Sequence, residues 1–268
     1  MRGPSVDSLL EQLSERDLAV LASLERFRLL TTGHLQRLHF ADHASDLASA
    51  RACTRSLRRL EEHELVSSLA RRIGGVRRGS ASYVWQLAAV GERLLRSLRG
   101  QARRRRFVEP GGTFVAHTLA VNDVAVALLE AGRTGQGLTV ERLATEPGNW
   151  RQYLGPGSET RWLKPDLHVV LVIADDDGEY EEHLFLEIDL GTEHLPRIRD
   201  KCATYAAYAA TGAYQADHGL FPAVVWLSPD PARRKALAAA VTGTPGLPEG
   251  AFRVAGPGAY VAGLGGAN

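Results

Sequence analysis

Cysteine is scarce in this chain of 268 residues, which contains only Cys53 and Cys202. The two lie far apart within helical patterns, and this favours two small buried thiols over a disulfide or a metal clip. No apolar run approaches the ~20 residues that a membrane helix needs. The charged N-terminal segment also lacks the apolar core of a signal peptide. We therefore expect a cytoplasmic protein that makes no membrane contact.

Lysine is also rare, with three residues, all in the second half, and the charges are segregated along the chain. Residues 1–110 carry 20 basic and 12 acidic side chains, a net charge of +8, and every one of the basic side chains is arginine. Residues 111–268 carry 12 basic and 19 acidic side chains, a net charge of −7. A basic half joined to an acidic half suggests a nucleic-acid grip next to a metal-binding site.

The first half has the pattern of a winged helix-turn-helix. Its apolar spacing predicts a helix over Glu15–Arg28, a short second helix after Thr31 and a third helix over roughly Leu47–Glu64. Two apolar strands separated by the turn GGVRRGSA follow, and then a last helix. We assign residues 1–100 to this domain and residues 101–112, a charge run ending in Pro-Gly-Gly, to a linker.

The third predicted helix has two chemically different faces. Arg51, Arg55 and Arg58 form one stripe at helical spacing, and apolar residues with the same spacing occupy the opposite side. A major-groove recognition helix requires this division. A solvated basic face and a winged helix that binds protein are the alternative interpretations. The predicted contacts to double-stranded DNA are the arginines of this helix and of the turn: Arg51, Arg55, Arg58, Arg59, Arg77 and Arg78.

Residues 113–268 are predicted to form an α/β domain with a mixed central sheet. An apolar helix opens it, and a Gly/Pro-rich loop around Pro156 and the acidic segment DDDGEYEE, expected to be a solvated hairpin loop, interrupt the strands. The overall class is α+β. The predicted strands are Leu138–Glu146, Leu167–Ala174, His183–Leu190 and AVVWLS. A helix is predicted over Leu195–Thr211, before the last of these strands.

Three carboxylates are expected to converge where two of these strands meet. Asp166 opens one strand, and alternation puts Glu187 and Asp189 on one face of the next. Buried negative charge of this kind needs a cation, and oxygen ligands suit Mg²⁺ or Mn²⁺. Lys201 and Tyr205 lie one turn apart on the following helix and can face the same site.

The second half resembles the PD-(D/E)XK nuclease superfamily, in Pro165-Asp166, in the tripeptide Glu187-Ile188-Asp189 and in the order of elements. The whole chain, over roughly residues 10–230, resembles the replication-relaxation family of actinobacterial plasmids and integrative elements. HTLAVND, FLEIDLGTE and the pair Lys201 and Tyr205 carry that resemblance. It is also similar to relaxases of the non-tyrosine mobilisation type.

The resemblance implies a restriction-endonuclease-like domain in which Asp166, Glu187 and Asp189 hold the metal. Lys201 would stabilise developing phosphoryl charge, and Tyr205 would orient the strand or attack phosphorus. Asp189 stands where the superfamily usually has lysine, so Lys201 would have to supply that cation. His117 and Glu146 are further candidates whose roles stay open.

Three functions remain in view. The first is a DNA-processing protein of a mobile element, acting in plasmid replication, relaxation or mobilisation, that binds an origin-like duplex and nicks or engages a strand. The second is a non-catalytic initiator or regulator whose nuclease-like domain is degenerate. The third is a restriction or defence nuclease. Other replication or mobilisation proteins and a second copy of the chain are the expected partners.

Overall fold

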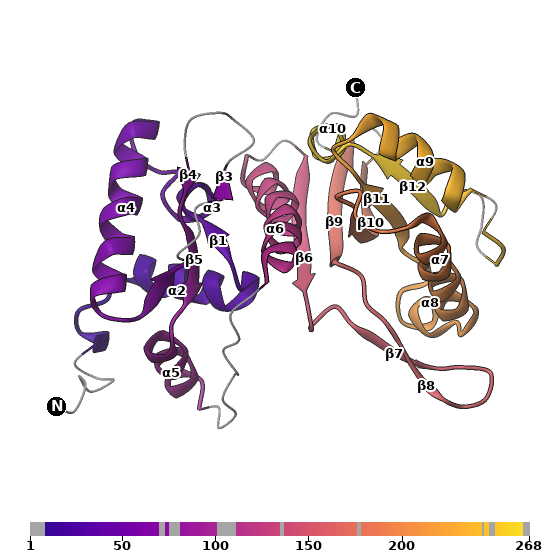
Figure 1. Ribbon diagram of the computed structural model, residues 1–268, viewed down its shortest axis with the longest axis horizontal. Helices are drawn as coiled ribbons and strands as arrows, with labels where there is room; N and C mark the ends of the chain where they lie inside the picture. The colour runs from indigo at the N-terminus through magenta and orange to yellow at the C-terminus, as the bar shows by residue number, and fades with distance from the viewer. Residues whose placement is uncertain are drawn as a thin grey trace. The chain divides into compact units, whose positions relative to one another are not determined.

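The computed structural model is a mixed α+β protein (Figure 1). It divides into two compact units, Met1–Val126 and Ala127–Asn268. The division falls inside helix α6 (Gly112–Arg133), whereas the sequence pattern placed the start of the second domain at residue 113. The structure describes residues 9–69, 73–74, 81–100, 111–134, 137–175, 178–242, 244–246 and 250–264.

Local capping signals set the first helices of the first unit. Ser14 caps α2, with its hydroxyl accepting from the Asp17 backbone N–H, and Thr31 caps α3 in the same way through His34. Each helix therefore begins where the sequence predicted. The helices of this unit before α6 are α2 (Glu15–Phe27), α3 (Thr32–His39), α4 (Asp46–Glu62) and α5 (Ala89–Leu98).

The first unit also contains a three-stranded antiparallel sheet. Its order is β1-β5-β2, and the side chains of Leu30, Leu57 and Leu60 lie fully buried within the unit. The two-residue strand β1 was not predicted, because two residues carry no periodicity. The strands are β1 (Leu30–Thr31), β2 (Val66–Ser68) and β5 (Val84–Leu87), with β3 (Ile73–Gly74) and β4 (Ala81–Ser82) paired between β2 and β5.

Helix α6 is long and apolar enough, by length and composition alone, to cross a membrane. The expectation that no stretch approaches that length was therefore wrong. Polar residues in its middle nevertheless have protein partners. The Asn122 amide donates to the Phe27 and Leu29 carbonyls at 3.0 and 2.6 Å, and Asp123 Oδ1 lies 2.6 Å from His34 Nε2. These are the contacts of a helix packed inside a protein.

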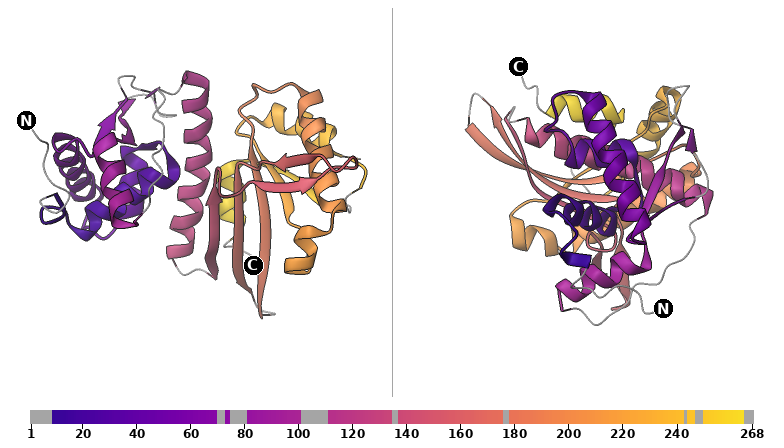
Figure 2. Two further views of the ribbon diagram at one scale, coloured as in Figure 1. Left: turned by 90° about the horizontal axis from the view of Figure 1, so that it is seen from below. Right: turned by 90° about the vertical axis from the view of Figure 1, so that its left-hand side faces the viewer.

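The second unit is built on a five-stranded sheet of order β12-β11-β10-β9-β6 (Figure 2). The pairs β6–β9 and β9–β10 are antiparallel, and β10–β11 and β11–β12 are parallel, so the predicted mixed sheet is confirmed. The strands are β6 (Leu138–Thr145), β9 (Leu167–Asp175), β10 (Gly178–Ile188), β11 (Ala223–Leu227) and β12 (Phe252–Ala255). The helices are α7 (Leu195–Ala210), α8 (Ala213–His218), α9 (Pro231–Val241) and α10 (Pro257–Leu264).

Two segments predicted as loops contain strands instead. The Gly/Pro-rich stretch forms a hairpin of β7 (Arg151–Leu154) and β8 (Thr160–Leu163), because Tyr153 and Leu163 on one of its faces are buried in the apolar core against α7. The acidic segment also departs from the prediction, since its residues from Gly178 onward belong to β10 and pair with β9. Burial of alternate residues outweighed the turn-forming composition in the first case.

Candidate functional site

Glu187 is a carboxylate enclosed in the core of the second unit, with 1% of its surface exposed. It lies next to the end of β10. Its Oε2 accepts a hydrogen bond from Lys201 Nζ at 2.5 Å, and its Oε1 accepts one from the Tyr205 hydroxyl. Both donors come from consecutive turns of α7, as their spacing predicted. The structure therefore brings these three predicted site residues together.

Asp166 is held beside Glu187 by backbone pairing between β9 and β10. Its N–H donates to the Leu186 carbonyl at 3.1 Å, and its Oδ2 accepts from the Ile188 N–H at 2.8 Å. The negative charge of Asp166 acts on both Glu187 and Lys201. Asp166 therefore joins the same cluster, which we call the Glu187 cluster: Asp166, Glu187, Lys201 and Tyr205.

Asn149 is part of this arrangement, and the sequence pattern did not reveal it. Its side chain is completely buried, and its Nδ2 donates to the carbonyl oxygens of Pro165 and Asp166 at 2.6 and 3.0 Å. These bonds fix the backbone on which the Asp166 carboxylate is carried. A contact between residues so far apart in sequence leaves no local pattern. The one available signal is that Asn149 precedes the apolar Trp150, and a fully buried amide side chain is unusual.

The environment of the cluster shifts the pKa values of Glu187, Lys201 and Tyr205. Burial raises the pKa of Glu187 to about 8, with the Asp166 charge adding to the rise and Lys201 and Tyr205 opposing it. Burial alone would lower the pKa of Lys201, but the neighbouring Glu187 and Asp166 charges outweigh it and raise that pKa. Burial and then Glu187 raise the pKa of Tyr205 well above its ordinary value. Tyr205 is therefore a hydrogen-bond donor rather than a ready phenolate nucleophile.

Asp189 bonds to residues outside this cluster. Arg233 of α9 contacts its carboxylate with Nη2 at 2.7 Å and Nε at 3.2 Å, and the Gly191 N–H donates to its Oδ1. Arg233 also donates to the Glu193 carbonyl at 2.6 Å. The ion pair is buried, with side-chain exposures of 15% and 2%. Sequence reasoning did not anticipate Arg233, which is 44 residues away.

The metal site predicted at Asp166, Glu187 and Asp189 stays a prediction. No three His, Cys, Asp or Glu side chains of the described residues form a group able to hold a metal ion. Asp189 already has a cationic partner in Arg233. Asp166 and Glu187 remain as oxygen donors, and Mg²⁺ is commonly bound by one or two carboxylates together with waters and substrate phosphates. The residues present fit that mode.

The predicted division of helix α4 into two faces is confirmed. Arg51, Arg55 and Arg58 are exposed, and the opposite face is buried. The buried residues are Ser49, Cys53, Ser56, Leu57 and Leu60. Arg77 and Arg78 lie outside the described residues.

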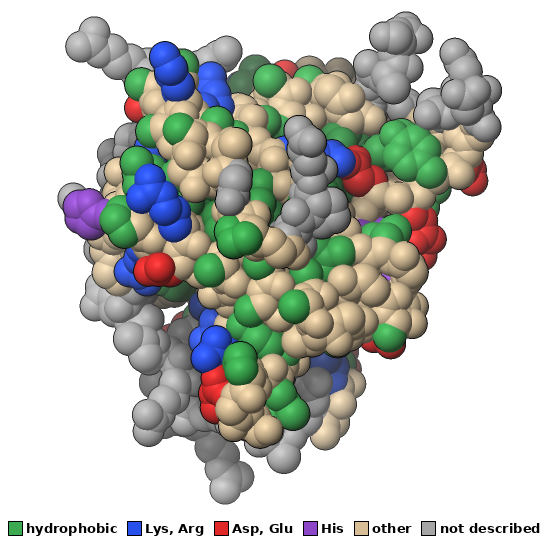
Figure 3. Space-filling model, turned by 90° about the vertical axis from the view of Figure 1, so that its right-hand side faces the viewer, with side chains coloured by type: hydrophobic (Ala, Val, Ile, Leu, Met, Phe, Trp, Pro, Cys, Tyr) green, Lys and Arg blue, Asp and Glu red, His purple; other side chains and the backbone are tan. Residues whose placement is uncertain are grey.

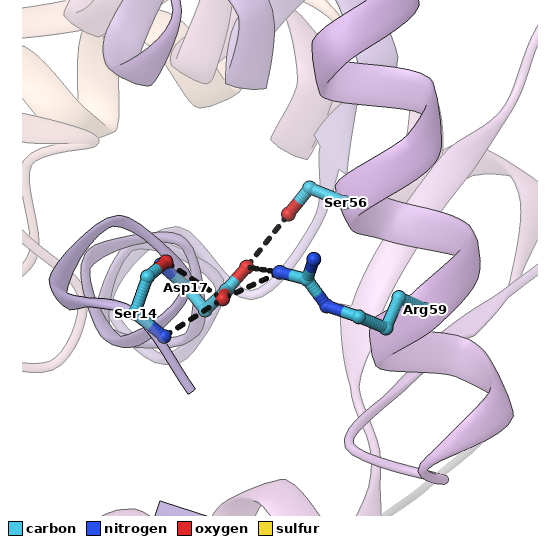
Figure 4. A network of polar contacts seen from close by, with 4 residues as sticks. All are labelled: Ser14, Asp17, Ser56 and Arg59. Atoms are coloured by element: carbon cyan, nitrogen blue, oxygen red, sulfur yellow. Dashed lines mark hydrogen bonds and ion pairs between the residues drawn. The ribbon is translucent and has the colours of Figure 1, made fainter. Parts of the chain in front are cut away.

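Arg59 of this helix forms an ion pair with Asp17, as Figure 4 shows. Its Nη2 lies 2.7 and 2.6 Å from the two carboxylate oxygens of Asp17, which is 1% exposed. Asp17 also accepts from the Ser14 N–H and Oγ at 2.9 and 2.7 Å and from Ser56 Oγ at 2.8 Å. These bonds tie α4 to the first turn of α2, so Arg59 has a structural partner, while its predicted DNA contact stays a prediction.

The acidic half of the chain does not present an unbroken acidic surface. Figure 3 shows one face of the second unit, on which basic and acidic side chains are interspersed among hydrophobic ones. The roles proposed for His117 and Glu146 stay predictions.

Comparison with known proteins identifies the chain at the level of the family. The sequence profile described as replication-relaxation matches residues 21–224, which is well over half of the chain and includes parts of both units. No curated protein and no solved structure matches it. The matched region contains the Glu187 cluster and helix α4. The chain therefore belongs to the replication-relaxation family.

Proposed function

We propose that the chain is a cytoplasmic DNA-binding protein of a mobile element that acts in plasmid replication, relaxation or mobilisation. The first unit would grip an origin-like duplex, and the second would nick or engage one strand. The observation that supports this most directly is the Glu187 cluster, in which a buried carboxylate, a neighbouring aspartate and a lysine meet at one place.

The first unit would act as a winged helix. Three helices are followed by β2 and β5, the strands that would flank the wing, and α4 occupies the place of the recognition helix. Its exposed arginines, Arg51, Arg55 and Arg58, can contact guanine edges or phosphates while its other face packs in the core. Arg59 contributes to this surface by holding the helix in place.

The second unit would act as a PD-(D/E)XK-like domain. Asp166 and Glu187 would hold Mg²⁺ or Mn²⁺, and the bound ion would polarise the phosphate and lower the pKa of a water molecule. Lys201, 30% exposed, reaches the edge of the cluster and would stabilise negative charge on the phosphoryl oxygens. Tyr205 would fix the orientation of the Glu187 carboxylate. Asp189 would stabilise the fold through its ion pair with Arg233 and would not bind the metal ion.

A non-catalytic initiator or regulator is the second candidate. The observation in its favour is that Lys201 already pairs with Glu187 and that Asp189, at the motif position usually held by lysine, pairs with Arg233. Both ion pairs satisfy the buried charges without any ligand. In this case the second unit would contribute contacts to DNA or to a second copy of the chain.

A nicking assay on supercoiled plasmid with Mg²⁺ or Mn²⁺ separates the two candidates. We expect the wild type to nick, Asp166→Asn and Glu187→Gln to lose nicking, and Lys201→Met to be about 10²- to 10³-fold slower. Glu179→Gln replaces an exposed acid on the same strand and should behave as wild type. Equal nicking by all five proteins would remove the Glu187 cluster from catalysis. Duplex binding by the wild type without any nicking would favour the non-catalytic candidate.

A further inference from the structure

The β7–β8 hairpin exposes an aromatic and apolar face. Register pairs Gln152 with Trp162 and Leu154 with Thr160, so these four side chains share one side of the hairpin. The opposite side is occupied by Tyr153 and Leu163, which are buried in the core. Trp162 is 46% exposed and Leu154 is 63% exposed. We call the four-residue side the outer face of the hairpin.

A second tryptophan and a lysine extend this outer face at the base of the hairpin. The rings of Trp150 and Trp162 lie 6.2 Å apart in an edge-to-face arrangement, and Lys164 Nζ lies 4.1 Å from the centre of the Trp150 ring. Residues 149–164 carry three basic side chains and one acidic side chain, a net charge of +2. The hairpin is therefore locally basic within the acidic half of the chain.

The hairpin is also joined directly to the Glu187 cluster. Asn149 at its first end donates to the carbonyls of Pro165 and Asp166, which follow its second end. Lys164 is two residues from Asp166 in the chain. Figure 1 shows the hairpin as a two-stranded arm. Its strand β8 contacts α7, the helix that supplies Lys201 and Tyr205.

From this geometry we infer that the outer face of the hairpin binds single-stranded DNA, with a base stacked on Trp162 and a phosphate beside Lys164. An exposed indole provides a surface on which any base can stack, and an adjacent ammonium group attracts the backbone. An exposed aromatic surface with the Lys164 ammonium group at its base fits a nucleic-acid strand better than an apolar protein surface. The inference deepens the proposed function, on which it rests, by naming the form of DNA that reaches Asp166 and Glu187.

The test measures binding of a fluorescently labelled oligo-dT by anisotropy, with a chelator present so that no cleavage can occur. We expect Trp162→Ala to weaken binding by about 5- to 150-fold, the range for loss of one base–aromatic stack. Trp162→Phe should restore most of the affinity because it keeps a stacking ring. Lys164→Gln should reduce the slope of log affinity against log salt by about 0.7, the value for one phosphate on a single strand.

Tyr180 supplies a matched control, because it is 47% exposed on β10 of the same unit but has acidic neighbours. Tyr180→Ala should bind oligo-dT as the wild type does. Equal weakening by Trp162→Ala and Tyr180→Ala, no effect of Trp162→Ala, or no binding of oligo-dT by the wild type would each overturn the inference. The last result would also leave a protein as the remaining occupant of the outer face.

Failure of the proposed function has a different signature. If Glu187→Gln nicks plasmid as the wild type does while Trp162→Ala still loses oligo-dT binding, the catalytic assignment fails and the strand-binding face stands. If Glu187→Gln abolishes nicking but Trp162→Ala binds oligo-dT normally, the catalytic assignment stands and the strand-binding face fails.

Discussion

Replacing Arg59 with alanine should destabilise the first unit by about 2 kcal/mol. The mutation removes the guanidinium that contacts both carboxylate oxygens of Asp17 and leaves that carboxylate buried. Breaking a fully buried ion pair costs about 3–5 kcal/mol, whereas an exposed pair contributes roughly 0–1 kcal/mol. Arg59 is 48% exposed, so its contribution lies between these limits. The remaining bonds from Ser14 and Ser56 also keep Asp17 partly satisfied.

The measurement is urea unfolding followed by circular dichroism, together with thermal unfolding of the same proteins. For a unit of this size, a loss of about 2 kcal/mol corresponds to a fall of roughly 6–10 °C in Tm. Arg58→Ala is the matched control because Arg58 is the adjacent residue and is exposed. It should change stability by less than about 0.5 kcal/mol. Equal stability of the two variants would refute the structural role assigned to Arg59.

The remaining predictions concern pH, duplex binding and the second unit. Burial alone would raise the pKa of Asp17, but the bonds from Ser14 and Ser56 and the charge of Arg59 hold it below its ordinary value of 3.8. Asp17 therefore stabilises the fold above that ordinary value, and this contribution should fade as the pH falls through the lower, folded pKa. Asp17→Asn should flatten the dependence of the urea midpoint on pH in that acidic range; an unchanged pH dependence would contradict the assignment. Replacing Arg55 and Arg58 with alanine should weaken duplex binding and lower the salt slope by about 0.9 for each phosphate that the variant no longer neutralises, while Arg93→Ala on α5 should bind as wild type. Unchanged affinity in the double variant would place the DNA face elsewhere. Arg233→Ala should destabilise the second unit by about 3–5 kcal/mol, because it leaves the buried Asp189 carboxylate without its cationic partner. Adding Asp189→Asn should restore much of that loss in urea unfolding, and a double variant as unstable as the single one would mean that the pair is not the cause.

The elements that the sequence predicted well are those whose signals are local. Ser14 and Thr31 mark the starts of α2 and α3, because a capping residue and the residue three positions later accept hydrogen bonds from the free backbone N–H groups at the same helix terminus. The alternation of arginine and apolar residues in α4 likewise predicted which face is exposed. Strand β1 and the β7–β8 hairpin were missed because they are short and depend on distant partners. Trp85 lies opposite Leu30, and Tyr208 packs on Tyr153.

The same distinction applies to the candidate site. The helical spacing of Lys201 and Tyr205 was enough to place both on one face of α7, and β-strand alternation predicted a shared face for Glu187 and Asp189. Neither pattern could reveal which cation each carboxylate would meet. The sequence pattern could not predict that Arg233 pairs with Asp189. Arg233 lies on α9, which follows another strand, and the two side chains meet only when α9 packs in the folded unit.

The charge balance of the site bears on whether Asp189 in place of lysine makes it inactive. The usual motif combines two acids and one lysine, a net charge of −1. Here Asp189 and Arg233 neutralise each other, and Asp166, Glu187 and Lys201 together again carry −1 when Glu187 is ionised, as binding of a cation would require. In the proposed nuclease-like site, the departure at Asp189 would therefore leave the charge offered to a divalent ion and a phosphate unchanged, because Arg233 compensates it and α7 would supply the lysine. Loss of Lys201, rather than the presence of Asp189, is the change that would alter this balance.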